Sequence, residues 1–116
     1  KAAARGYKQV ITIQGVNDDP RLPEASLDAI LIVNAYHEMV EFDAMLRAMH
    51  RALKPGGRLG IIDANATAGL SRSEYQKNHH IPQSLVREDA LRNGFTFRNN
   101  GEEFRNHDWH FTVFTK

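Results

Sequence analysis

The stretch RALKPGGRLGIID, residues 51–63, decides how the rest of the chain is interpreted. Pro55 disfavours helical backbone at Lys54, and Gly56 is able to take the left-handed conformation that ends many helices. The apolar run at residues 59–62 is typical of a buried strand. The stretch therefore predicts that a helix ends at Lys54, that Gly56 has a positive φ, and that a strand follows.

Three glycines in this stretch, Gly56, Gly57 and Gly60, also suggest a nucleotide-binding loop. A phosphate-binding glycine loop follows a strand and opens a helix, so that amide groups at the helix N-terminus face the anion. Here the order is reversed, because the glycines lie between a helix and a strand. The stretch is interpreted as a helix-to-strand turn. A nicotinamide-dependent dehydrogenase is disfavoured, since its strand-to-helix glycine loop is missing from the sequence.

The sequence before this turn predicts two strands and a helix. Residues 29–33 form a continuous apolar run between Asp28 and Asn34, which is typical of a strand covered on both faces, as in parallel sheets. Apolar residues at steps of three and four predict an amphipathic helix over residues 41–53. Further upstream, β-branched residues predict a short strand over residues 8–14.

The sequence after the turn predicts a loop, a helix and two strands. Residues 64–78 are polar and irregular, and their length is typical of functional loops. A helix is predicted over residues 82–93, opened by a proline and ended by Gly94. Alternating aromatic and polar residues predict strands at residues 95–97 and 109–113, and we expect these two strands to pair antiparallel.

The alternation of strands and helices predicts one α/β domain over residues 1–116. The apolar fraction of 41% and the charged fraction of 25% are ordinary for a globular protein. A net charge of +1 indicates neither nucleic acid nor an anionic membrane as a partner, and no apolar run is long enough to span a bilayer. The sequence has no cysteine, which excludes disulfides and is consistent with the cytoplasmic location that we expect.

Three segments together resemble a known family. They are LPEASLDAILIVNAYHE at residues 22–38, RALKPGGRLGIID at residues 51–63 and ALRNGF at residues 90–95. Their order and content resemble the C-terminal half of class I S-adenosylmethionine-dependent methyltransferases. Within that group the chain is most similar to the small bacterial enzymes of the ubiquinone-biosynthesis type. Leu-Lys-Pro-Gly-Gly in this setting is the most specific of the shared motifs.

The resemblance implies a Rossmann-like, three-layer fold with a mostly parallel sheet and one antiparallel strand near the C-terminus. The family's strand order is third, second, first, fourth, fifth, seventh, sixth. The family's acidic residue and Gly-x-Gly loop after the first strand are absent, so we expect a fold that is incomplete relative to the family. Residues 29–34, as the fourth strand, then have a bare edge. Either residues 8–14 move beside them, or two chains pair through such edges, and we favour a homo-oligomer.

The resemblance also implies where a cofactor binds. Asp18 matches the acid that follows the third strand and faces the adenine amino group, and Asp19 is a near-equal substitute; both also suit a simple turn. Asn34, Ala35 and Tyr36 follow the fourth strand, at the strand end where open α/β sheets bind ligands. We therefore expect these five residues to bind S-adenosylmethionine.

His37 is the candidate catalytic base, because imidazole titrates near neutral pH and methyl transfer to a protonated nucleophile needs a base. The alternative is that His37 and Glu38 only cap the following helix. Asp63, at the end of the fifth strand, faces the substrate side or caps a turn.

We expect no metal site. Adjacent residues on a strand point to opposite faces, so His79 and His80 would not converge on one ion there. His107 and His110 are the other closely spaced pair, and the sequence has neither cysteine nor a His-Glu-x-x-His motif.

The function expected from the resemblance is transfer of a methyl group from S-adenosylmethionine to an unidentified small-molecule acceptor. The alternative is a non-catalytic remnant or interaction module that keeps the sheet without a cofactor site. Since the chain lacks the glycine loop, we expect it to bind S-adenosylmethionine weakly or not at all by itself.

Overall fold

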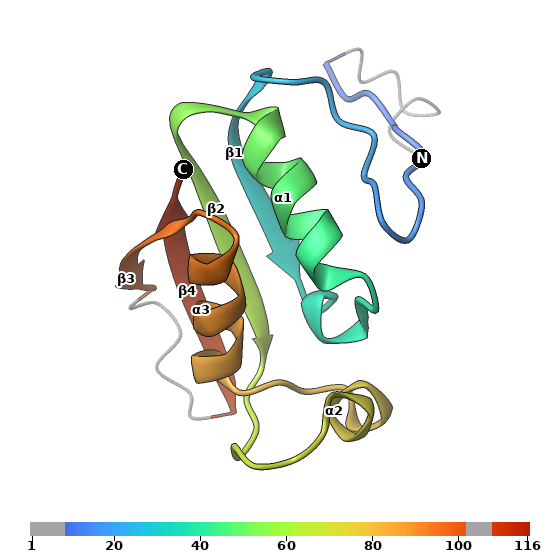
Figure 1. Cartoon of the computed structure of the whole chain (residues 1–116), viewed down its shortest axis with the longest axis vertical. Helices are drawn as coiled ribbons and strands as arrows, with labels where there is room; N and C mark the ends of the chain where they lie inside the picture. The colour runs from blue at the N-terminus through green and yellow to red at the C-terminus, as the bar shows by residue number, and fades with distance from the viewer. Residues whose placement is uncertain (1–8, 102–107) are drawn as a thin grey trace.

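The computed structural model describes residues 9–101 and 108–116. Four strands form one sheet with the order β1-β2-β4-β3 (Figure 1). The elements along the chain are β1 (Leu27–Val33), the 3-10 turn η2 (Tyr36–Glu38), α1 (Phe42–Ala52), β2 (Leu53–Ala64), α2 (Arg72–Asn78), α3 (Gln83–Arg92), β3 (Thr96–Asn100) and β4 (Trp109–Thr115). Lys8, within the predicted first strand, and His107 lie outside the described residues.

The pairing of the strands confirms the predicted α/β class. β1 and β2 are parallel and are joined through α1, whereas β4 runs antiparallel to both β2 and β3. If β1 is the fourth strand of the family, the order β1-β2-β4-β3 is the expected fourth, fifth, seventh and sixth. None of the helices in the described parts of the chain is long and apolar enough to cross a membrane.

The helix-to-strand turn has the predicted geometry with a small shift of its boundary. α1 ends at Ala52, and Leu53 already has extended backbone with ψ 141°. Gly56 has φ +80°, which confirms the predicted left-handed conformation. Leu27 pairs with Leu53 and Ala29 pairs with Arg58. The residues between Leu53 and Arg58, which include Pro55, Gly56 and Gly57, therefore bulge out of the β1–β2 ladder.

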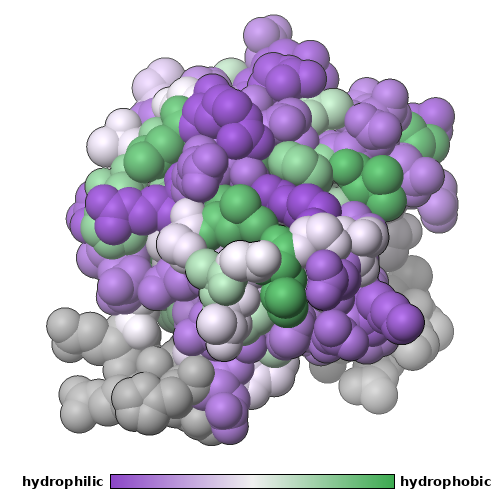
Figure 2. Space-filling view, turned by 60° about the horizontal axis from the view of Figure 1, so that its bottom comes forward, coloured by the Kyte–Doolittle hydropathy of each residue, from purple (hydrophilic) through white to green (hydrophobic). Residues whose placement is uncertain are grey.

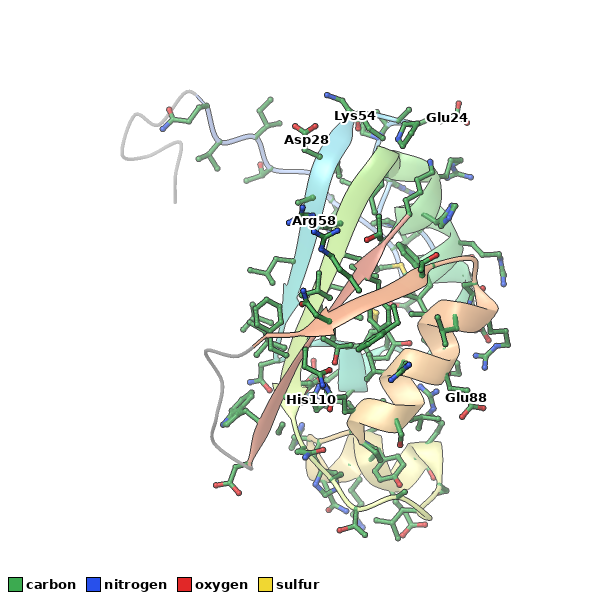
Figure 3. The ribbon with its side chains drawn as sticks, turned by 90° about the vertical axis from the view of Figure 1, so that its left-hand side faces the viewer. Glu24, Asp28, Lys54, Arg58, Glu88 and His110 are labelled. Carbon is green, nitrogen blue, oxygen red and sulfur yellow. The ribbon has the colours of Figure 1, made fainter. Side chains whose placement is uncertain are left out.

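Both long helices, α1 and α3, lie on one face of the sheet (Figures 1 and 3). The core lies between these helices and that face. Its central residues are fully buried apolar side chains from the two helices and from two strands: Leu46, Leu59, Ile61, Val86, Ala90 and Phe114. α1 and α3 are therefore fixed on the sheet by buried apolar side chains.

The opposite face of the sheet carries no helix in the described parts of the chain. Leu31 and Val33 of β1 are 61% and 55% exposed, and Phe111 and Val113 of β4 are half-buried. The prediction that residues 29–33 are covered on both faces is therefore wrong for this chain. Of the expected three layers, residues 9–101 and 108–116 form two.

The predicted strand over residues 8–14 is also wrong over its described part. Residues 9–14 form no strand, and Ile11 is 80% exposed. Within residues 9–101 and 108–116, β1 is thus an edge strand that pairs with β2 alone, and residues 9–14 do not supply the fifth strand of a reduced sheet. Pairing of two chains through this edge stays a prediction.

Residues 64–78 are not irregular throughout, because their second half forms α2. The Ser71 side chain accepts a hydrogen bond from the Glu74 backbone, and the Glu74 side chain accepts one from the Ser71 backbone. The next helix matches its prediction: Pro82 is the N-cap of α3, and Gly94 follows its end with φ +91°.

Candidate functional site

Polar residues gather where the parallel strands β1 and β2 end, which is the edge at which open α/β sheets bind ligands. Asn34 follows β1 with φ +52°, a left-handed conformation that asparagine tolerates. Its backbone N–H donates to the Ile62 carbonyl oxygen over 2.8 Å. The chain then turns through η2, which places His37 beside Asp63 near the end of β2. Figure 2 looks onto this end, where a small apolar area lies among polar side chains.

His37 and Asp63 form a buried pair at this edge, with 3% and 0% of their surfaces exposed. Asp63 Oδ1 lies 2.7 Å from His37 Nδ1, and Oδ2 accepts the His37 backbone N–H over 3.0 Å. Asp63 Oδ1 also accepts the Ala64 backbone N–H over 2.9 Å. A carboxylate that accepts two backbone donors is placed to accept the Nδ1 proton too, so His37 carries its proton on Nδ1.

This tautomer leaves the lone pair of His37 on Nε2. That atom is buried and has no hydrogen-bond partner among the described residues. The nearest acidic oxygen is Glu38 Oε1, at 3.8 Å, and the ring of His79 lies edge-on to that of His37, with the ring centres 5.6 Å apart. The ring of His37 is therefore fixed by Asp63, and its Nε2 is available to accept a proton or to bind a ligand.

Tyr36 anchors η2 to α3 instead of facing the strand end. Its hydroxyl donates to Asp89 Oδ2 over 2.8 Å, and Arg72 and Arg92 both pair with the same buried carboxylate. Burial, followed by the charge of Asp89, raises the pKa of Tyr36, so the hydroxyl stays a donor. Because its side chain lies in the core, the cofactor contact predicted for Tyr36 would have to be made by its backbone.

Two hollows border α1, and one of them lies at the strand end. The first, of about 250 Å³, is lined by residues from the segment before β1, from the turn after β1 and from the start of α1: Val16, Asn17, Ala35, Glu38, Met39, Val40 and Met45. The second, of about 410 Å³, is lined by Asp18, Asp19, Ala44, Arg47, Ala48 and Arg51. The predicted cofactor residues are thus divided: Ala35 lines the first hollow, whereas Asp18 and Asp19 line the second.

Asp19 also has a local role, because its Oδ1 accepts the Arg21 backbone N–H over 2.7 Å. The cofactor roles predicted for Asp18, Asp19 and Asn34 stay predictions.

His110 is the cross-strand neighbour of Asp63 on β4 and was not expected there. It is buried on β4 (Figure 3), in register with Asp63. Its Nε2 lies 3.0 Å from the Ile81 carbonyl oxygen. Burial lowers the pKa of His110, which favours the neutral ring. The imidazole that pairs with the Asp63 carboxylate is that of His37, over 2.7 Å.

Sequence reasoning missed the contact between His79 and the His37 turn. From the sequence, a capping role for Glu38 is only an alternative, and His79 is compared with His80 alone. The readable signal was the Ser71–Glu74 capping box, which predicts α2 and places His79 at its C-terminal end.

A family model described as a methyltransferase domain matches residues 1–61. A ubiquinone/menaquinone biosynthesis C-methyltransferase from Rubrivivax gelatinosus is 33% identical over 72 residues, which are 62% of this chain and 29% of that protein. The chain therefore spans less than a third of the length of this curated relative.

Two solved structures share the fold. An S-adenosylmethionine-dependent methyltransferase from Aquifex aeolicus superposes with a TM-score of 0.78 at 18% identity, over 98% of this chain and 58% of that one. The cyclase SpnF superposes with a TM-score of 0.72 at 19% identity, over 98% of this chain and 59% of that one. Because one of these two proteins is a cyclase, the shared fold by itself does not define the reaction.

Proposed function

Because this chain belongs to the methyltransferase domain family, we propose that the protein transfers a methyl group from S-adenosylmethionine to a small-molecule acceptor. The observation that carries the proposal is the buried His37–Asp63 pair at the C-terminal ends of the parallel strands β1 and β2. A base held in a fixed tautomer beside a strand end suits a reaction in which a protonated nucleophile is methylated.

S-adenosylmethionine, when bound, supplies an electrophilic methyl group on a sulfonium. In the proposed reaction His37 would accept the acceptor's proton at Nε2 as the acceptor's nucleophilic atom bonds to the methyl group, while the methyl–sulfur bond breaks and S-adenosylhomocysteine leaves as a neutral thioether. Asp63 holds the Nδ1–H in place over 2.7 Å and stabilises the imidazolium that forms. The burial of both side chains excludes water, so the charge of Asp63 acts on His37 with little screening.

The first hollow fits part of the cofactor. Its lining combines apolar side chains, Ala35, Met39 and Met45 among them, with the polar Asn17. Its volume of about 250 Å³ is below the roughly 300–1,000 Å³ of ordinary small-molecule sites. This hollow therefore suits one end of S-adenosylmethionine, which supports weak binding by the 116-residue chain and stronger binding by a protein that supplies the remaining contacts.

The direct test follows a labelled methyl group in the protein that contains this chain. Quinol precursors are the first acceptors to test, because the curated relative is named for ubiquinone and menaquinone biosynthesis. We expect His37→Gln to lower kcat by about 10²–10⁴-fold, the usual contribution of general base catalysis. The matched variant His50→Gln, on α1, should keep full activity. Equal rates in the two variants would remove His37 from the reaction.

A further inference from the structure

We propose that His37, Glu38 and His79 form a binding site for one divalent transition-metal ion, with zinc as the best fit. Two imidazole nitrogens and one carboxylate oxygen are a common zinc ligand set. This inference goes beyond the proposed methyl transfer, and it concerns residues that the sequence reasoning did not combine.

The three ligand atoms already converge. His37 Nε2 lies 3.8 Å from Glu38 Oε1, and His79 Nδ1 lies 3.7 Å from the same oxygen. All three atoms lie within 4.8 Å of one another. Zinc bonds of about 2.0–2.2 Å in a tetrahedral arrangement place ligand atoms roughly 3.3–3.6 Å apart. The Glu38 and His79 side chains are 61% and 70% exposed, so they are free to make the remaining small adjustment.

His37 supplies the independent sign of a ligand. Its Nε2 is buried without a hydrogen-bond partner among the described residues, and it lies on the side of the ring that faces Glu38 and His79. Asp63 binds the opposite nitrogen, which fixes the lone pair on Nε2. Metal-binding histidines usually donate their other N–H to a carboxylate in this way. The pair thus has the arrangement of a metal ligand with its supporting group.

The backbone brings the ligands together from two segments. His37 and Glu38 are adjacent in η2, whereas His79 ends α2 in the left-handed conformation, with φ 58° and ψ 42°. Gln76 of α2 donates to the Met39 carbonyl oxygen over 3.4 Å and so links the two segments. With three protein ligands, a tetrahedral ion keeps one position open for water or for an atom of a bound molecule.

Metal binding and base catalysis use the same lone pair of His37. Zinc would therefore compete with proton transfer to Nε2, and we expect added zinc to inhibit methyl transfer. The two proposals fail separately, because zinc binding is measured without S-adenosylmethionine or an acceptor.

The test is calorimetric titration of zinc chloride into the 116-residue chain. We expect one zinc per chain with micromolar or tighter affinity. Glu38→Gln and His79→Asn should each weaken binding by at least about tenfold. Asparagine is chosen at His79 because it tolerates the left-handed backbone. Glu41→Gln and His50→Asn are the matched controls and should bind zinc like the wild type.

Cobalt(II) provides a second readout that reports geometry. A four-coordinate cobalt complex should give strong visible absorption with the wild type, and His79→Asn should lose it. The proposal is overturned if the wild type takes up no zinc, if the site variants bind as tightly as the wild type, or if the controls weaken binding equally. Circular dichroism of each variant verifies that the fold is kept.

Discussion

Replacing Asp63 with asparagine tests the central pair of the site. The carboxylate accepts three donors: His37 Nδ1, the His37 backbone N–H and the Ala64 backbone N–H. Asparagine has one acceptor oxygen, and its NH₂ group would face at least one of these donors inside a fully buried site. A lost charged hydrogen bond together with an unpaired buried donor costs about 2–4 kcal/mol.

The same change alters the chemistry of His37. The amide lacks the negative charge that holds the Nδ1 proton, which weakens Nε2 as a proton acceptor and as a metal ligand, and an NH₂ group in the Oδ1 position would move the proton to Nε2. Asp63→Asn should therefore lose methyl transfer and zinc binding together, even under conditions in which the variant is fully folded.

Urea unfolding, followed by the fluorescence of the single tryptophan, Trp109 of β4, measures the stability change. Asp28→Asn is the control, because the Asp28 side chain is 89% exposed and its ion pair with Lys54 lies at the surface. We expect the control to stay within about 0.5 kcal/mol of the wild type. A loss of less than about 1 kcal/mol in Asp63→Asn would refute the account of this buried pair.

Three further outcomes are expected. Gly56→Ala should cost about 1 kcal/mol through its positive φ alone, whereas Gly57→Ala should cost more, because its Cβ would lie 2.9 Å from the Lys54 carbonyl oxygen; the reverse order in urea unfolding would contradict this. Burial lowers the pKa of His110, so stability should be complete above about pH 6.5 and should fall at lower pH by at most about 1.4 kcal/mol per pH unit; His110→Gln should have a shallower slope, and an unchanged slope would count against the assignment. The bare β1 edge predicts a dimer of the 116-residue chain by light scattering at micromolar concentration, and a monomer would remove edge pairing.

Much of the fold was predictable because its signals are local. The turn at residues 51–63 was identified from a proline and a glycine whose backbone preferences act without tertiary contacts. The strand predicted over residues 8–14 is wrong over residues 9–14 for the opposite reason. β-branched residues favour a strand only where another strand supplies hydrogen bonds, and no strand in the described parts of the chain does so here. α2 was missed because Tyr75 is its only buried residue, so the helix has little apolar periodicity.

The candidate site was predictable only in part. His37 and the strand end were identified from their position after an apolar run, and Asp63 was left between two interpretations. The contact between these two residues joins positions 26 apart in sequence, and it depends on the register of β1 on β2. The approach of His79 to His37 depends on how α2 packs on η2, which no spacing in the sequence encodes.

Titration of S-adenosylmethionine into the protein that contains this chain tests the account most directly, when wild type is compared with two variants that fill different hollows. Ala35 lines the hollow at the end of β1, and Ala44 lines the separate hollow beside Asp18 and Asp19. We predict that the wild type binds the cofactor and that Ala35→Trp weakens binding at least tenfold, or about 1.4 kcal/mol, and more than Ala44→Trp does. Normal binding by Ala35→Trp, or no binding by the wild type, would contradict the placement of the cofactor at this strand end.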